Sequence, residues 1–322
     1  MNTTAPKVSP PGKCSMGDLV IVNPTEEYFV SDVIACMVNA TLTISTLLLN
    51  SIMVIAYSKS SQLRKNISNF LIMVLSCIDV AIGGIVNLIF TVFLLTKITR
   101  SGSCMLLFVI LKLIMMLSGM SVATMSSMNL ERYIAILHPM THRAKLTKER
   151  LLMFALLFWS RYIDAFIVSF TSQNTQGKMV VSLRLCYIIF TIWTYVKIFL
   201  AMRKSRRIFP LNNAKSTNNT TSSLETSFNR KKQFLKELKV AKSYILVISS
   251  NFICFVPQLI ITALYYNGLL VTQLDLFNTW AITVVLSNST LNSMLFFWLN
   301  RRLRYDSIAI LKQTCMCVLS QV

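Results

Sequence analysis

Long apolar segments alternate with short polar connections along almost the whole of this 322-residue chain. Each segment reaches the length of about 20 residues that an α-helix needs to cross the hydrocarbon core of a membrane. None shows the regular alternation of apolar and polar residues that is typical of membrane barrel strands. The pattern therefore predicts an all-α membrane protein built as a seven-transmembrane helix bundle. The predicted spans are 30–57, 67–95, 103–136, 150–170, 179–202, 240–265 and 273–298.

The overall composition agrees with this pattern. Hydrophobic residues make up 54% of the chain and charged residues only 14%. A soluble domain carries about 25% charged residues. Most of the molecular surface is therefore expected to lie in lipid.

The basic residues are distributed unevenly between the two sets of connections. Four stretches hold 22 of the 32 Lys and Arg residues, and the connections on the other side, including residues 1–32, hold five. Because basic loops stay in the cytoplasm, the N-terminus is predicted outside and the C-terminus inside. The net charge of +20 could also suggest a nucleic-acid-binding surface. The positions favour membrane lipids as the partner instead, and no nucleic acid is expected. The basic stretches are 58–66, 137–150, 203–242 and the residues after 299.

The topology divides the chain into three parts and predicts a multi-pass protein of the plasma membrane. Residues 1–32 form an extracellular tail that is too short for a folded ligand-binding domain. Residues 33–298 form the bundle, with 203–239 as the third cytoplasmic loop. Residues 299–322 are predicted to form an amphipathic helix and a cytoplasmic tail.

Three kinds of covalent modification are compatible with this topology. Asn2 lies in an Asn-Thr-Thr glycosylation sequon on the outer side. Cys14 and Cys104 both lie outside and could form a disulfide. Cys315 and Cys317 follow the basic amphipathic stretch on the inner side and are candidate palmitoylation sites.

Asp79, in the segment LSCIDV, lies near the middle of the second span. An ionisable group at this depth needs a proton, a cation or polar partners. Asn50, Ser121 and Asn292 come from three other spans at a comparable depth. Together these four residues could form a hydrated pocket that holds sodium through oxygen ligands. The alternative is a protonated Asp79 that is hydrogen-bonded across helices. No other metal and no organic cofactor is expected.

Two further pairs of charged residues within the predicted spans carry an expectation. Arg161 and Asp164 are three residues apart on one helix face and are expected to pair. Lys112 and Arg184 lie nearer the outer ends of their spans. They are expected to snorkel to the outer interface, with contact to an anionic ligand group as the alternative.

The sequence gives no sign of an enzyme. The two histidines, His138 and His142, lie in a cytoplasmic connection and are expected to be solvated loop residues. No metal-binding or nucleophilic constellation accompanies them.

Glu131 and Arg132 end the third span at its cytoplasmic side. Glu237 precedes the sixth span on the same side, 20 residues before Pro257. We expect an Arg132–Glu237 ion pair to hold the third and sixth helices together, and its rupture to open a cavity toward the cytoplasm.

Several short motifs, in order, resemble the rhodopsin-like, class A G-protein-coupled receptors. LSCIDV resembles the second-helix Leu-Ser-x-x-x-Asp pattern, and ERYIAILHP resembles the Asp/Glu-Arg-Tyr motif. CFVP resembles the sixth-helix Cys-Trp-x-Pro, and LNSMLFFWLNRRLR resembles the Asn-Pro-x-x-Tyr motif with the eighth helix. Asn50, Trp159 and Tyr195 match single positions of the first, fourth and fifth helices.

The resemblance implies a receptor in which an extracellular ligand opens helix six and activates a heterotrimeric G protein. A short, cysteine-free second outer loop and a proline-free fifth helix are similar to the melanocortin, cannabinoid and adenosine receptor group. Ile114 stands where amine receptors carry an aspartate, and 273–298 contains no lysine for retinal. The ligand is therefore expected to be neither an amine nor covalent retinal. The implied activation residues are Glu131, Arg132, Tyr133, Tyr195, Glu237, Phe255, Pro257, Asn292 and Phe296.

Three positions depart from the family pattern. Phe255 replaces the sixth-helix tryptophan, and Ser293 and Phe296 replace the proline and tyrosine of the seventh helix. These changes leave open a receptor-like seven-helix protein with weak or no G-protein coupling. A small membrane transporter is the other alternative, although it would predict more charges inside the membrane and internal repeats.

Overall fold

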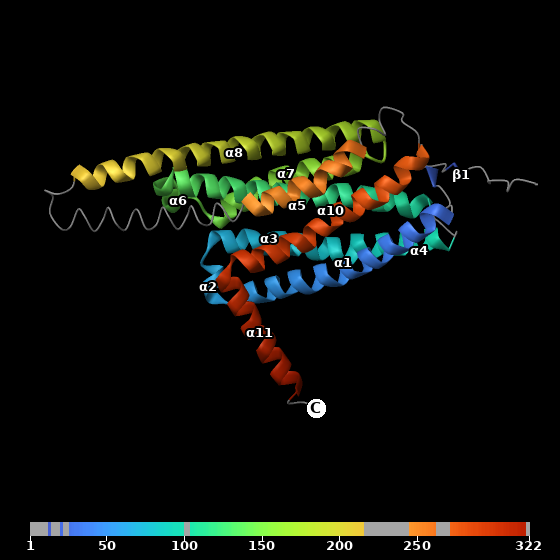
Figure 1. Ribbon diagram of the computed structural model, residues 1–322, viewed down its shortest axis with the longest axis horizontal. Helices are drawn as coiled ribbons and strands as arrows, with labels where there is room; N and C mark the ends of the chain where they lie inside the picture. Colours follow the sequence, from blue (N-terminus) through green and yellow to red (C-terminus); the bar gives the residue numbers. More distant parts are fainter. Residues whose placement is uncertain are drawn as a thin grey trace, which may run out of the picture.

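The computed structural model describes residues 12–13, 20–21, 26–99, 104–215, 245–261 and 271–319. Its long helices lie side by side in one bundle (Figure 1). The predicted all-α bundle of seven helices is confirmed, and each predicted span coincides with a helix. The helices that carry the spans are α1 (Glu26–Lys59), α3 (Ile67–Ala81) with η1 (Ile82–Asn87) and α4 (Leu88–Ile98), α5 (Cys104–Leu137), α7 (Lys148–Val168), α8 (Gln173–Lys215), the helix Ile245–Ile261, and α10 (Val271–Leu299).

Short elements lie at the two ends of the bundle. Two two-residue strands, β1 (Gly12–Lys13) and β2 (Val20–Ile21), pair antiparallel. At the opposite end, α2 (Ser61–Arg64) and α6 (Pro139–Lys145) connect long helices. The last helix, α11 (Arg301–Leu319), runs away from the bundle to one side, as expected for a helix along a membrane surface (Figure 1).

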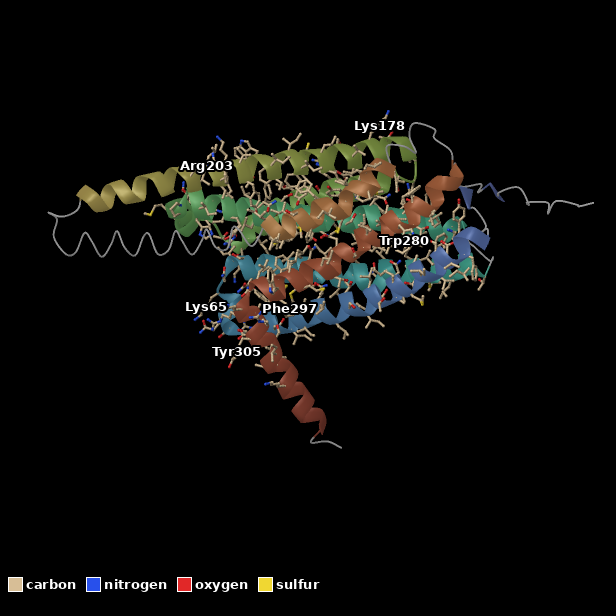
Figure 2. The ribbon with its side chains drawn as sticks, viewed as in Figure 1. Lys65, Lys178, Arg203, Trp280, Phe297 and Tyr305 are labelled. Carbon is tan, nitrogen blue, oxygen red and sulfur yellow. The ribbon has the colours of Figure 1, made fainter. Side chains whose placement is uncertain are left out.

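The two ends of the bundle can be followed in Figure 2. Lys65 and Arg203 lie at one end, which we call the basic end, and Lys178 and Trp280 lie toward the other. At the basic end α11 is fixed to the bundle by two polar contacts. Ser60 donates a hydrogen bond to Asp306 (2.7 Å), and the Asn300 amide donates one to Asn69 (3.0 Å).

Polarity in this bundle is the inverse of that in a soluble protein. Large apolar side chains cover its outside, where Leu157, Ile189 and Ile253 are at least 66% exposed. Asparagine, serine and threonine side chains are buried between the helices. This arrangement is expected in lipid, where polar groups find hydrogen-bond partners only inside the protein.

Helices α1 and α10 are joined by hydrogen bonds along their length. The Asn39 amide donates to the Thr283 hydroxyl (2.8 Å), and the hydroxyls of Thr46 and Thr290 lie 2.6 Å apart. These contacts connect polar groups that would otherwise face hydrocarbon.

Helix α5 lies against α3, α7 and α8. On its α7 side, the Trp159 indole donates hydrogen bonds to the Met120 carbonyl (3.1 Å) and the Thr124 hydroxyl (3.2 Å). On its α8 side, the Asn129 amide donates to the Thr191 hydroxyl (3.3 Å). The contacts of α5 therefore fix three neighbouring helices relative to one another.

Two connections differ from the sequence predictions. Helix α8 continues to Lys215, so the first part of the expected loop 203–239 is helical. Residues 216–244 lie outside the described part of the chain. The segment around the two histidines forms α6, which begins with Pro139. Proline is favourable at this first position, because a backbone N–H there would have no partner within the helix.

Gly119 permits the close crossing of α5 and α7. A Cβ atom at this position would overlap the ring of Tyr162, which is 2% exposed and cannot swing into open space. Small residues allow such close helix approach in membranes.

We predict that Gly119→Ala lowers the stability of the folded protein by about 1–3 kcal/mol through overpacking. The measurement is the apparent melting temperature of the purified protein. Gly84→Ala is the matched control, because its new Cβ would meet only Leu47 Cδ2 at 3.4 Å. Its melting temperature should stay the same or rise, since alanine favours helix over glycine. Equal melting temperatures for the two variants would contradict the assignment.

Candidate functional site

Ser289 on α10 is the centre of the predicted polar pocket. Asp79 is 1% exposed, and its Oδ1 accepts a hydrogen bond from the Ser289 hydroxyl (2.8 Å). The Asn50 amide donates to the Thr46 carbonyl (3.0 Å) and to the Ser289 carbonyl (3.4 Å). Asn292 is fully buried and lies three residues after Ser289, on the same face of α10. Asn50 and Asp79 are therefore brought together through a residue that the sequence reasoning missed.

Several buried oxygens in this region have no hydrogen-bond partner. They belong to Asp79 (Oδ2), Asn292 (Oδ1), Asn50 (Oδ1), Ser121 (Oγ) and Asn288 (Oδ1). Hard cations are bound by carboxylate, amide and hydroxyl oxygens of this kind. The residues present therefore fit a bound sodium ion. Groups of three or more His, Cys, Asp or Glu that could hold a metal are absent from the described residues.

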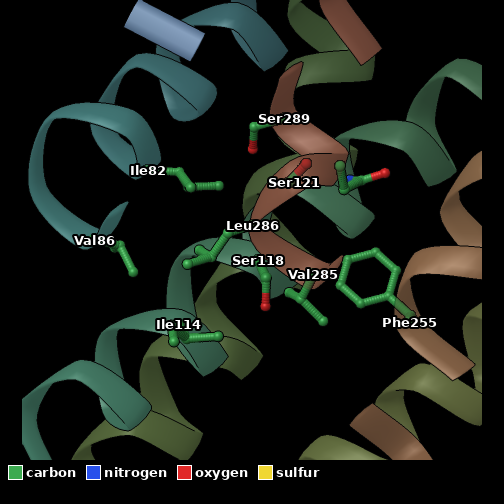
Figure 3. Close-up of a pocket in the computed structure, with 10 residues that line it drawn as sticks. Ile82, Val86, Ile114, Ser118, Ser121, Phe255, Val285, Leu286 and Ser289 are labelled. Carbon is green, nitrogen blue, oxygen red and sulfur yellow. The ribbon is translucent and has the colours of Figure 1, made fainter. Parts of the chain in front are cut away.

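A small cavity lies between this polar region and Phe255. Ser121, Asn288 and Ser289 line it together with apolar side chains. Figure 3 shows Phe255 on one side and Ile82 on the other. The centre of a water-sized sphere can occupy about 10 Å³ of the cavity. That is room for about one water molecule.

Glu131 and Arg132 form a buried cluster near the basic end of α5. Arg132 Nε lies 2.5 Å from Glu131 Oε2, and Arg132 Nη2 lies 2.9 Å from Oε1. The Ser68 hydroxyl of α3 contacts both side chains, as an acceptor from Arg132 and a donor to Glu131. Glu131 and Arg132 are 2% and 5% exposed. Glu131 therefore neutralises the charge of Arg132 inside the bundle.

His142 also belongs to this cluster, and the prediction of a solvated loop histidine is wrong. Its Nε2 lies 3.0 Å from Glu131 Oε1, because α6 folds the connection back beneath α5. His138 lies beside the Tyr133 ring, with 6.0 Å between ring centres. The rings of Tyr133 and Trp193 of α8 are tilted by 31° to each other, with 5.2 Å between ring centres.

The remaining predicted switch residues lie between the helices. Phe296 is buried in an apolar cluster that Tyr195 also contacts. Phe255 is buried in a second cluster, nearer the other end of the bundle. Pro257 is partly buried in the helix Ile245–Ile261. Glu237 lies outside the described residues, so the expected pair with Arg132 stays a prediction.

Lys112 and Arg184 do not snorkel to the interface, contrary to expectation. Lys112 is 7% exposed and donates a hydrogen bond to the Ser169 carbonyl (3.4 Å), near the end of α7. Arg184 is 3% exposed and points inward, where it donates to the Ser118 hydroxyl (3.2 Å). Both side chains are buried between neighbouring helices.

One charged pair was predicted and another was missed. Arg161 and Asp164 pair at 3.4 Å on the outside of α7, as predicted. Asp32 of α1 and Lys97 of α4 form an ion pair of 3.1 Å, with both side chains almost fully buried. Opposite charges at the outer ends of the first two spans were the available signal for this second pair.

The predicted modification sites cannot be compared with the structure. Asn2 and Cys14 lie outside the described residues. Cys104 begins α5, and Cys315 and Cys317 lie on α11, but the described side chains do not include these three. The glycosylation, disulfide and palmitoylation sites stay predictions.

Most of the chain matches a known protein family. Residues 49–296 match the family described as 7 transmembrane receptor (rhodopsin family). The match covers more than half of the chain and does not distinguish a group within the family. No curated protein matches the sequence. The chain belongs to the rhodopsin family of seven-transmembrane receptors.

Proposed function

We propose that this protein is a plasma-membrane receptor that converts binding of an extracellular ligand into activation of a heterotrimeric G protein. The basic end faces the cytoplasm in this proposal, and the N-terminus lies outside. The observation that carries it is the buried Glu131–Arg132–Ser68 cluster at the basic end of a rhodopsin-family bundle.

The ligand is proposed to bind toward the other end, among the helices around Phe255. Phe255 borders two small cavities between helices. Tyr265, a further expected contact, lies outside the described residues. A ligand shifts the receptor toward its open state only to the extent that it binds that state more tightly.

Opening is proposed to occur by a swing of the sixth helix about Pro257. Proline removes one backbone hydrogen bond and is a common cause of kinks. Arg132 is held by Glu131 and Ser68 in the described structure. Movement of the sixth helix would break the proposed Arg132–Glu237 contact and expose the inner face of α5 to the G protein.

Two other functions remain as alternatives. The first is a receptor-like protein that couples weakly to G proteins. It is suggested by Phe296, which lacks the hydroxyl of the family's tyrosine and is buried in an apolar cluster. A transporter would be expected to line a path with charged residues. The buried charged residues in the described part of the chain instead lie at separate places: the Asp32–Lys97 pair, the Glu131–Arg132 pair, Asp79, Lys112 and Arg184. Nucleotide exchange without solute flux in vesicles would favour the receptor.

Sodium is proposed as an allosteric ligand of the Asp79 pocket. The unpaired oxygens of Asp79, Asn292 and Ser121 supply suitable ligands. A monovalent cation would compensate the buried carboxylate charge of Asp79 and stabilise the closed bundle.

We predict that Glu237→Ala raises ligand-free nucleotide exchange on a G-protein panel. The increase should be about fivefold if the pair stabilises the closed state by about 1 kcal/mol. Glu225→Ala, a change of the same charge in the same connection, is the control and should leave basal exchange unchanged. Unchanged basal exchange in Glu237→Ala at equal surface expression would count against the proposed contact.

We also predict that sodium chloride, compared with potassium chloride at equal concentration, raises the melting temperature of the purified receptor. A sodium concentration of tenfold its Kd should stabilise the protein by about 1.4 kcal/mol. Asp79→Asn should abolish the difference between the salts, and Asp164→Asn should preserve it. The same sodium dependence in Asp79→Asn would rule out this pocket.

A further inference from the structure

Arg184 is a buried cation without a carboxylate partner in the described part of the chain. Its Nη2 donates to the Ser118 hydroxyl (3.2 Å) and lies 3.8 Å from Met115 Sδ. Its guanidinium carbon lies 5.2 Å from the centre of the Phe255 ring. Its Nε has no hydrogen-bond partner. A planar group with five N–H donors is thus only partly satisfied.

Two other buried cations in the described part of the chain are paired with carboxylates. Lys97 is paired with Asp32 at 3.1 Å, and Arg132 is paired with Glu131 at 2.5 Å. An uncompensated buried charge is destabilising, and arginine cannot relieve this by losing its proton. A negative group that reaches Arg184 would therefore be bound strongly.

A small void beside Arg184 can admit such a group. The centre of a water-sized sphere can occupy about 20 Å³ of it. Its walls are mostly apolar or aromatic and include Ile188, Phe252, Phe255 and Leu259. A compact anion such as a carboxylate fits this volume, whereas a larger polar group does not.

An apolar groove follows directly from this void. Phe252 lines both, and the groove continues between α8 and the helix Ile245–Ile261 as far as Phe199. Its volume is about 410 Å³. From Arg184 to Phe199 the distance along α8 is about 22 Å at 1.5 Å per residue. Ile192 and Phe199 on its edge are about half exposed, so the groove opens to the outside of the bundle, where lipid lies.

We propose that the ligand of this receptor is a long-chain monocarboxylate whose carboxylate pairs with Arg184 and whose acyl chain lies in the α8 groove. The proposal rests on the proposed receptor function and specifies its ligand class. The guanidinium supplies two parallel N–H donors for a carboxylate. The apolar groove supplies burial for an unbranched tail, which can enter sideways from the membrane.

Binding of tritiated hexadecanoate to the full chain in phosphatidylcholine nanodiscs tests the proposal. We expect saturable binding to the wild type and a loss of about tenfold to a hundredfold in affinity for Arg184→Gln. Lys112→Gln is the matched control, because Lys112 contacts Ser169 instead of the void; it should change affinity less than twofold. Hexanoate and methyl hexadecanoate should compete poorly, since one lacks the tail and the other the charge.

A second variant guards against misfolding of Arg184→Gln. Phe252→Trp narrows the junction between the void and the groove and leaves Arg184 unchanged. It should lower the binding affinity for hexadecanoate more than that for hexanoate. The proposal would be overturned if hexadecanoate did not bind saturably to the wild type. It would also be overturned if Arg184→Gln bound hexadecanoate with the same affinity as the wild type. Preference for hexadecyl phosphate over hexadecanoate would overturn the assignment of a carboxylate.

Nucleotide exchange in the same nanodiscs separates this proposal from the receptor function. Saturable hexadecanoate binding without any exchange would support the ligand class and count against G-protein activation. Basal exchange that responds to Glu237→Ala, without hexadecanoate binding, would overturn the ligand class and leave the receptor function standing.

Discussion

The whole arrangement depends on the confinement of polar groups to the interior of the bundle. Hydrocarbon offers no hydrogen-bond partners, so each polar side chain within a span must find one inside the protein, on its own helix or on a neighbouring one. The Asn39–Thr283 and Thr46–Thr290 contacts satisfy this condition between α1 and α10. The condition is met incompletely at several buried side chains in the described part of the chain, and two of them, Asp79 and Arg184, belong to the proposed sites. Unpaired polar atoms that persist in such an interior are the natural places for ions and ligands.

Helix α5 connects these places. Ser118 and Ser121 face Arg184 and the polar cavity, and Glu131 and Arg132 lie further along the same helix. The hydrogen bonds of Trp159 and Asn129 fix α5 against α7 and α8. A ligand-driven change around Phe255 would therefore move the sixth helix relative to α5, which stays fixed. This is the physical basis for coupling between the two ends in the proposed mechanism.

Much of the fold could be predicted from the sequence because lipid imposes a simple rule on length and hydropathy. Seven apolar segments identified the spans, and opposite charges three residues apart identified the Arg161–Asp164 pair. The direction of single side chains could not be predicted in the same way. Arg184 was expected at the interface, but its helix face is turned inward; His142 was expected in solvent, but α6 folds it against Glu131. Ser289 was missed since serine is common in spans, and only the packing of α10 against α3 makes it the partner of Asp79.

The proposed receptor function requires that the basic end faces the cytoplasm. The accessibility of an inserted epitope tests this orientation most directly. An epitope inserted after Lys231 should be detected by antibody only in permeabilised cells, whereas one inserted after Lys7 should be detected in intact cells. Detection of the Lys231 epitope on intact cells would contradict the orientation, and with it the positions proposed for the ligand and the G protein.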